Sequence, residues 1–191
     1  MNALIFATNN QHKVDEMRSI LGESFSILSL KEAGLNIDIP EPHDTLEANA
    51  TEKSRTIHQL TGSDCFSEDT GLEVEALSGE PGVKSARYAG DDSIFKDNID
   101  KLLFNLKDIT NRKARFRTVL SLILDDKEYL FEGICPGSIT TVRSGEKGFG
   151  YDPVFIPDGS DRTFAEMDMN EKNRFSHRKK AMEKLLIFLK Q

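Results

Sequence analysis

Cysteine and long apolar runs are scarce in this sequence. Its two cysteines, Cys65 and Cys135, are far apart and belong to no CxxC pair, so we expect neither a disulfide framework nor a zinc site. This cysteine usage best fits a reducing compartment, and we expect a cytoplasmic protein. The longest apolar runs are only a few residues and no basic leader precedes the first of them, so we expect no membrane span and no signal peptide.

Positive charge is also in short supply. The 191 residues include 25 Lys and Arg against 32 Asp and Glu, which gives a formal net charge of −7. A general polyanion-binding surface needs the opposite excess, so we expect no nucleic-acid partner, and an anionic ligand should be small and held locally. The length suits one core of good size, and we expect a single domain over residues 1–191.

The N-terminal half alternates short apolar runs with amphipathic segments. Residues 3–7 are continuously apolar, as in a strand buried on both faces, and a polar turn leads into a helix over residues 11–21. A short strand over residues 25–30 and a proline-containing loop follow. Asp44 to Glu47 has the form of a capping box for a helix over residues 45–61 that stops at Gly62.

The C-terminal half is richer in strand patterns. Strand pieces are predicted over residues 65–67 and 72–77, followed by a helix that Asp91 and Asp92 cap and whose apolar positions run from Ile94 to Leu106. The remaining elements are three neighbouring antiparallel strands over residues 114–124, 128–134 and 138–142, a glycine-rich loop over residues 144–151, an apolar run over residues 154–156 and a terminal amphipathic helix.

Two adjacent carboxylates, Glu68 and Asp69, follow a short apolar run. Neighbouring residues on a strand point to opposite faces, so both reach one metal ion only if the backbone turns there, and Gly71 permits such a turn. Glu41, in a proline-flanked loop, is placed to join them around an ion. The segment is a candidate metal or catalytic site, although such strings are also common in ordinary surface turns.

The segment from Thr8 to Lys13 carries the first strand into a helix start. N–H groups without helical partners and the helix dipole favour an anion there, so the turn can hold phosphate with Lys13 as a point charge. It lacks the glycines of a Walker sequence, and an ordinary capped turn is the alternative. Lys53, on the second helix, is either a solvated lysine or a phosphate clamp.

Two later segments combine aromatic and basic residues. Residues 148–153 place Phe149 and Tyr151 beside glycines, where a ring can stack on a base or pack on the core. Residues 171–178 gather basic groups just before and at the start of the last helix, where cations oppose the helix dipole. Such a local conflict is expected where function overrides fold.

Five motifs in order, TNNQHK, SEDTGLEVEAL, PGVKSARYAG, GFGYDPVF and EKNRFSHR, resemble the inosine triphosphate pyrophosphatase family over nearly the whole chain. The resemblance implies an α/β fold with a mixed sheet in two lobes, flanking helices and a central nucleotide cleft. It also implies a Mg²⁺-dependent homodimer that hydrolyses ITP, dITP, XTP and dXTP to the monophosphate and pyrophosphate, removing them from the nucleotide pool.

The resemblance also implies roles for individual residues. Asp69 matches the catalytic acidic residue, and Glu41 and Glu68 are its companions at the metal. Thr70, a substrate contact, stands where the family usually has serine, and His43 stands where it commonly has glycine. The other implied substrate-binding residues are Thr8, Asn9, Asn10, Gln11, His12, Lys13 and Lys53 for the phosphates, Phe149, Gly150, Tyr151 and Asp152 in the base-binding loop, and Lys172, His177 and Arg178 closing over the base.

A mechanism follows as a hypothesis. Asp69 orients and deprotonates the water that attacks the α-phosphorus, and donors from His177 and Arg178 pair with the C6 oxygen of hypoxanthine or xanthine. Three alternatives stay open: a pyrophosphatase for modified pyrimidine triphosphates, a non-catalytic nucleotide sensor and a protein-binding domain. The carboxylates count against the sensor, because binding a polyanion gains nothing from them unless a metal is handled.

Overall fold

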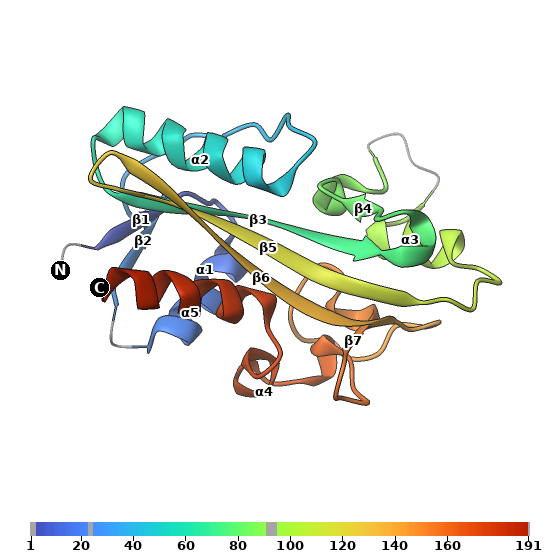
Figure 1. Ribbon diagram of the computed structural model, residues 1–191. Helices are drawn as coiled ribbons and strands as arrows, with labels where there is room; N and C mark the ends of the chain where they lie inside the picture. Colours follow the sequence, from blue (N-terminus) through green and yellow to red (C-terminus); the bar gives the residue numbers. More distant parts are fainter. Residues whose placement is uncertain (1–2, 23–24, 91–94, 191) are drawn as a thin grey trace. The chain divides into compact units, whose positions relative to one another are not determined.

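The structure is a computed structural model that describes residues 3–22, 25–90 and 95–190 (Figure 1). Its strands are β1 (Leu4–Phe6), β2 (Ile27–Ser29), β3 (Cys65–Val74), β4 (Pro81–Gly82), β5 (Lys113–Leu124), β6 (Lys127–Ile139) and β7 (Phe155–Pro157). Its helices are α1 (Gln11–Leu21), α2 (Leu46–Thr61), α3 (Asn98–Asn105), α4 (Met169–Asn173) and α5 (His177–Leu189). Within the described residues, no helix combines the length and the apolar character needed to span a membrane.

The strands form one mixed sheet in the order β2-β1-β3-β5-β6-β7, with β4 added to β3. Strand β1 runs parallel to β2 and β3, whereas β7 is antiparallel to β6. Asp125 and Asp126, both with positive φ, form the two-residue turn that joins β5 to β6 and makes them antiparallel. The predicted α/β class with a mixed sheet and flanking helices is confirmed.

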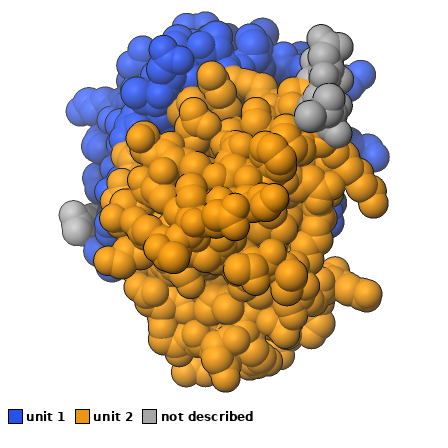
Figure 2. All heavy atoms as spheres, turned by 90° about the vertical axis from the view of Figure 1, so that its right-hand side faces the viewer, with its two compact units in different colours: residues 1–69, 118–133, 178–191 blue, residues 70–117, 134–177 orange. Residues whose placement is uncertain are grey.

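The chain divides into two compact units, which Figure 2 colours separately. Unit 1 comprises residues 1–69, 118–133 and 178–191, and unit 2 comprises residues 70–117 and 134–177. The chain passes from one unit to the other within β3, β5 and β6 and at the start of α5. Neither unit is a continuous segment, and the single domain over residues 1–191 stays a prediction.

In unit 1, helices cover both faces of the parallel strands. Leu4 and Phe6 of β1 belong to an apolar cluster with α1 and α5, whereas Ile5 and Ala7 belong to another with Ile57 of α2. Side chains alternate along a strand, so the continuous apolar run is buried on both sides, as predicted. Figure 1 shows α2 on one face of these strands and α1 on the other.

Helix starts depart from the predictions in two places. The N-cap of α2 is Thr45, whose hydroxyl accepts from the N–H of Ala48 at 3.2 Å, so the capping box that begins at Asp44 is wrong by one residue. Helix α3 begins at Asn98 and is capped by Asp97. The predicted helix began earlier, and its Asp91, Asp92 and Ile94 lie outside the described residues.

Unit 2 is built around aromatic side chains from several elements. Phe116 of β5 meets Phe155 of β7 edge to face, with ring centroids 4.6 Å apart. Strand β6 is continuous through Pro136, so the two strands predicted over residues 128–134 and 138–142 are wrong in being separate. A Cβ at Gly137 would collide with the carbonyl of Ile156, so glycine is required there by the close approach of β7.

Candidate active site

The carboxyl ends of β1 and β3 meet where the crossover direction of unit 1 reverses. Strand β1 lies between β2 and β3. Parallel crossovers are right-handed, so α1, which leads to β2, and α2, which leads to β3, lie on opposite faces (Figure 1). Ligands of α/β sheets bind at the carboxyl ends beside such a reversal. The residues there are 8–10, after β1, and 67–69, within β3.

The turn after β1 is organised by its own side chains. The Thr8 hydroxyl accepts from the N–H of Asn10 at 3.1 Å, and the Asn10 side chain caps α1 by accepting from the N–H of Lys13 at 3.3 Å. Asn9 donates to a loop carbonyl at 2.8 Å. The predicted passage from strand through polar turn to helix start is confirmed. The exposed residues of the turn and first helical turn are Asn9, Asn10, Gln11 and His12.

Glu68 is buried among charged partners from α1 and α5. Arg178 Nε lies 2.9 Å from Glu68 Oε2, Arg178 Nη2 lies 3.0 Å from Oε1, and Lys13 Nζ lies 3.0 Å from Oε1. Arg178 Nη1 also donates to Glu16 Oε2 at 2.7 Å. Burial alone would raise the pKa of the Glu68 carboxyl, but the charges of Arg178 and Lys13 outweigh it and hold this pKa far below the ordinary value. Glu68 is therefore held ionised.

Asp69 faces different partners, from α2 and the loop before it. Its Oδ2 accepts from the side-chain amide of Asn49 at 3.2 Å, and Lys53 Nζ lies 3.7 Å from its Oδ1. Lys53 also forms a hydrogen-bonded ion pair with Glu41. Burial raises the pKa of the Asp69 carboxyl above its ordinary value, Lys53 opposes this shift and the negative charge of Glu41 adds to it.

Strand β3 continues without a break through both carboxylates, so the predicted turn after Asp69 is wrong. Gly71 does not adopt positive φ. Glycine is needed there because a Cβ would come within 2.6 Å of the carbonyl oxygen of Gly82 in β4. In a continuous strand Glu68 and Asp69 point to opposite faces, and the condition under which both reach one ion is not met.

Glu41 and Asp69 supply oxygen donors that fit a hard divalent cation. Glu41 contributes to the raised pKa of Asp69, so the two carboxylates interact, and Lys53 offsets only one of their two charges. Mg²⁺ is usually held by one or two carboxylates together with substrate phosphates and water. Nowhere in the described part of the chain do three Asp, Glu, His or Cys side chains gather closely enough to hold a metal by themselves.

In unit 2, a buried ion pair holds the predicted base-binding loop. Lys172 Nζ lies 2.6 Å from Asp152 Oδ2, and both side chains are buried. The same carboxylate oxygen accepts from the N–H of Phe149 at 3.0 Å, and the Lys172 ammonium lies 5.4 Å from the centroid of the Phe149 ring. These contacts fix the half-exposed Phe149 ring, and Gly150 follows it in an exposed position.

Tyr151 and His177 are core residues of unit 2. The Tyr151 hydroxyl donates to the carbonyl of Ser85 at 2.7 Å, and burial raises the pKa of this phenol. The His177 ring stacks on Phe116 with centroids 4.8 Å apart. Of the three predicted base-contacting rings, Phe149 is the one that is half exposed.

The expected conflict with the dipole of the last helix is relieved. Lys172 lies in the last turn of the separate helix α4, where a cation is favourable. Arg178 is the second residue of α5, but within unit 1 its charge is balanced by Glu68 and Glu16. The prediction that these basic groups oppose stability is therefore wrong for these two residues.

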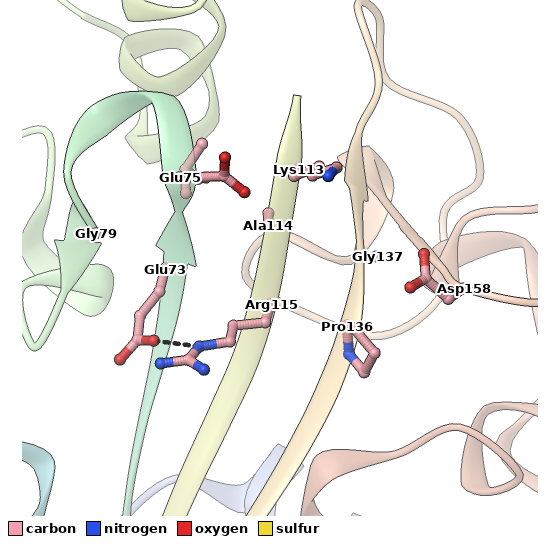
Figure 3. Close-up of a pocket in the computed structure, with 10 residues that line it drawn as sticks. Glu73, Glu75, Gly79, Lys113, Ala114, Arg115, Pro136, Gly137 and Asp158 are labelled. Atoms are coloured by element: carbon pink, nitrogen blue, oxygen red, sulfur yellow. Dashed lines mark hydrogen bonds and ion pairs between the residues drawn. The ribbon is translucent and has the colours of Figure 1, made fainter. Parts of the chain in front are cut away.

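Of two cavities, one is lined by predicted substrate-binding residues and the other is not. A cavity of about 480 Å³ in unit 1 is lined in part by Thr8, Asn9 and Gln11 of the phosphate turn. A cavity of about 530 Å³ in unit 2 is lined by strand residues that were not predicted, among them the ion pair of Arg115 and Glu73, 2.6 Å apart (Figure 3). Its three acidic side chains, Glu73, Glu75 and Asp158, outnumber its two basic ones, Lys113 and Arg115, which does not suit a triphosphate.

Comparison with known proteins gives a family match along nearly the whole chain. A sequence model of the Ham1 family matches residues 4–188. This chain belongs to the Ham1 family. Similar Ham1-family proteins include the dITP/XTP pyrophosphatases of Flavobacterium psychrophilum, 50% identical over 187 residues with 98% of each chain covered, and Porphyromonas gingivalis, 50% identical with 99% of this chain and 98% of the relative covered.

Solved Ham1 structures resemble the fold closely. The Staphylococcus aureus Ham1 protein gives a TM-score of 0.86 at 36% identity, with 99% of this chain and 98% of that chain covered. A HAM1 protein from Coxiella burnetii gives 0.88 at 34% identity, with 100% and 99% covered. The resemblance to the pyrophosphatase family is thus confirmed, together with the fold class.

Sequence reasoning missed two polar side chains of this Ham1 site, Glu16 and Asn49. Glu16 follows Lys13 by three residues and lies beside the apolar positions of α1, yet it is 3% exposed. Asn49 precedes Lys53 by four residues, one helical turn, and is fully buried. The sequence did contain a signal for both residues: each places a charged or amide side chain on the buried stripe of an amphipathic helix.

Proposed function

We propose that this protein hydrolyses the non-canonical purine nucleotides ITP, dITP, XTP and dXTP to the monophosphate and pyrophosphate. The observation that carries the proposal is Asp69, a buried carboxylate with a raised pKa beside Lys53 where the carboxyl ends of β1 and β3 meet. Relatives about half identical over nearly the whole chain are named dITP/XTP pyrophosphatases, which supports the substrate class.

We assign the triphosphate to the turn after β1 and to Lys53, and the base to the loop that carries Phe149. The first-turn N–H groups of α1, Lys13 and Lys53 bind phosphate oxygens, and Thr70 adds its hydroxyl. Phe149 stacks on the base, held in place by the ion pair of Lys172 and Asp152. The central nucleotide cleft stays a prediction.

The chemistry follows from the release of pyrophosphate in one piece. The water oxygen forms a bond to the α-phosphorus, the bond from this phosphorus to the α–β bridging oxygen breaks, and its electron pair leaves with pyrophosphate. Asp69 accepts the proton of the attacking water, for which it must be ionised. Lys13 and Lys53 balance the negative charge of the phosphates.

Mg²⁺ is the cofactor that we propose, with Glu41 and Asp69 as its protein ligands. When bound, it neutralises phosphate charge and lowers the barrier to displacement of the leaving group. Glu68, which the sequence placed at the metal, is assigned instead to the ion pairs that hold α1 and α5. The residues present thus supply two of the three predicted ligands.

Selectivity for 6-oxo purines through donors of His177 and Arg178 stays a prediction. His177 is buried against Phe116, and the guanidinium nitrogens of Arg178 pair with Glu68 and Glu16, so these donors reach a C6 oxygen only if those contacts rearrange. The predicted homodimer and cytoplasmic location belong to the same proposal. Light scattering of the purified protein tests the dimer, for which we expect twice the chain mass.

The decisive test incubates the purified protein with Mg²⁺ and dITP, XTP, dGTP, dATP or dUTP and measures pyrophosphate. We expect release from dITP and XTP far above release from the other three. Preference for dUTP would indicate a pyrimidine enzyme. No release from any nucleotide, with binding retained, would indicate a sensor.

A further inference from the structure

The face of α2 that covers the sheet is unusually polar. Its buried residues include Asn49, Lys53 and Ser54, whereas a helix that packs on a sheet ordinarily does so with an apolar stripe. Asn49 and Lys53 contact Asp69. Ser54, fully buried, belongs to a second polar group that the reaction does not use directly.

This second group converges on one carboxylate, Glu128 of β6. Thr51 and Ser121 donate to its Oε1 at 2.5 and 2.8 Å, and Arg55 Nη2 lies 2.8 Å from its Oε2. The Ser54 and Ser121 hydroxyl oxygens are 2.7 Å apart, and the Ser54 hydroxyl also lies 3.1 Å from the Thr51 carbonyl, to which it donates. The carboxylate therefore joins α2 to both β5 and β6 within unit 1.

The spacing along α2 links this group to Asp69. A helix rises about 1.5 Å per residue, so Thr51 is only about 3 Å along the axis from both Asn49 and Lys53. Apolar side chains tolerate sliding, whereas hydrogen bonds have fixed lengths and directions and are costly to break where the acceptor, like Glu128, is mostly shielded from water. The bonds to Glu128 thus determine how far α2 is shifted and rotated relative to β3 and β5.

We propose that Glu128 is a positioning residue for the reaction at Asp69: by holding Thr51, Arg55 and Ser121 it fixes α2 so that Lys53 and Asn49 face the Asp69 carboxylate. The inference rests on the proposed pyrophosphatase function. Glu128 itself contacts neither substrate nor metal in this assignment, and it acts only through α2.

The test compares Glu128→Ala with Glu128→Gln by steady-state hydrolysis of dITP. A displacement of about 1 Å costs up to about 10²-fold in rate, so we expect Glu128→Ala to lower kcat by about 10- to 100-fold with KM changed less than about threefold. Glu128→Gln retains the oxygen that accepts from Thr51 and Ser121, and we expect it to recover most of kcat.

A matched control separates positioning from general loss of an ion pair. Glu73 and Arg115 in unit 2 form an ion pair (Figure 3). The Glu73 carboxylate is 22% exposed, against 20% for Glu128. We expect Glu73→Ala to change kcat by less than about twofold. A loss of kcat equal to that of Glu128→Ala would overturn the inference.

Thr51→Val keeps the test decisive if Glu128→Ala does not fold. It preserves side-chain shape and removes one donor, so we expect a smaller loss of kcat, about three- to tenfold. Unchanged kcat with a lowered melting temperature would mean a purely structural role and would overturn the inference. An inactive wild-type protein would overturn the proposed function as well, whereas active wild type with fully active variants would overturn only the positioning role.

Discussion

Glu68 and Asp69 are adjacent in the chain and both buried, but they face different surroundings. Two cations surround Glu68, Arg178 through two of its nitrogens and Lys13 through its ammonium. Lys53 lies 3.7 Å from Asp69, the charges of Lys53 and Lys13 lower the pKa of this carboxyl, and the charge of Glu41 raises it. The pKa of Glu68 is consequently lowered, and that of Asp69 is raised.

The difference shows that burial alone does not decide what a carboxylate does. Burial is the largest influence on both pKa values and raises each of them. At Glu68 the positive charges of Arg178 and Lys13 outweigh the effect of burial on the pKa. The ionised carboxylate therefore holds α1 and α5 to β3. At Asp69 the positive charge is too small to outweigh burial, and the carboxylate is left able to take a proton.

The largest expected effect separates the two residues by activity. Asp69→Asn removes the proton acceptor, and we expect kcat for dITP to fall by about 10²- to 10⁴-fold. Since the raised pKa means that ionised Asp69 costs stability at neutral pH, the melting temperature should not fall. Pyrophosphate release and thermal unfolding measure the two quantities, and near-normal turnover would contradict the assignment.

Glu68→Gln should give the opposite pattern. It removes the carboxylate that pairs with buried Arg178 and half-buried Lys13, while Glu16 still pairs with Arg178. Breaking such a pair costs about 3 kcal/mol, and each kcal/mol lowers the melting temperature by about 2–4 °C in a chain of this size. Because the folded pKa of Glu68 is lowered, its stabilising effect is present above the ordinary value of 4.5 and is lost as pH falls below it.

Two observations check this prediction for Glu68. The difference in unfolding free energy between wild type and Glu68→Gln should narrow on acidification below about pH 4.5. The double variant Glu68→Leu with Arg178→Met should regain only part of the lost stability, because it removes both charges of the buried pair while Glu16 loses Arg178 and Lys13 loses Glu68. A single variant as stable as wild type would contradict the account.

Substitutions of Glu41 and Glu68 should differ in their effect on the metal requirement of the enzyme. We expect chelation by EDTA to abolish pyrophosphate release, and Glu41→Gln to raise the Mg²⁺ concentration for half-maximal rate by about tenfold or more. Glu68→Gln, assayed well below its melting temperature, should leave this concentration within about twofold of wild type. The reverse result would place Glu68 at the metal after all.

The smallest expected effect on stability concerns His58. The folded state favours its protonated ring, so protonation of His58 stabilises the fold. Its ring nitrogens lie 2.9 Å from the Ser63 carbonyl and 2.9 Å from Asp126, and both partners raise the pKa above 6.5. The stabilisation is present below pH 6.5 and is lost as pH rises through the raised pKa. His58→Asn should lower the melting temperature by about 2–4 °C at about pH 6 and by less at about pH 8.

Local pattern predicted the elements that depend on local chemistry. The bounds of α1 and the end of α2 at Gly62 follow from periodicity and capping, and both are confirmed. Gly71 was wrongly interpreted as permitting a turn, and the strand around Gly137 was wrongly divided in two. Each glycine is required by a strand that approaches from elsewhere in the chain, and such a contact has no local signature.

The candidate site was also predicted only in part. Motif order identified Asp69, Lys53, Lys13 and the residues near the C-terminus, because their types recur in a known order. It did not reveal that Arg178 pairs with Glu68 or that Asn49 contacts Asp69, since these contacts join residues 110 and 20 positions apart. Which carboxylate neutralises which cation depends on the folded arrangement.

The half-exposed Phe149 ring has a practical consequence for spectroscopy. The chain contains no tryptophan, so Phe149→Trp would introduce its sole indole fluorophore. Excitation at the red edge of protein absorption would then select this one residue against a background of three tyrosines. Under the proposed assignment of the base to this loop, its emission would follow nucleotide arrival in real time, with natural, unlabelled substrates.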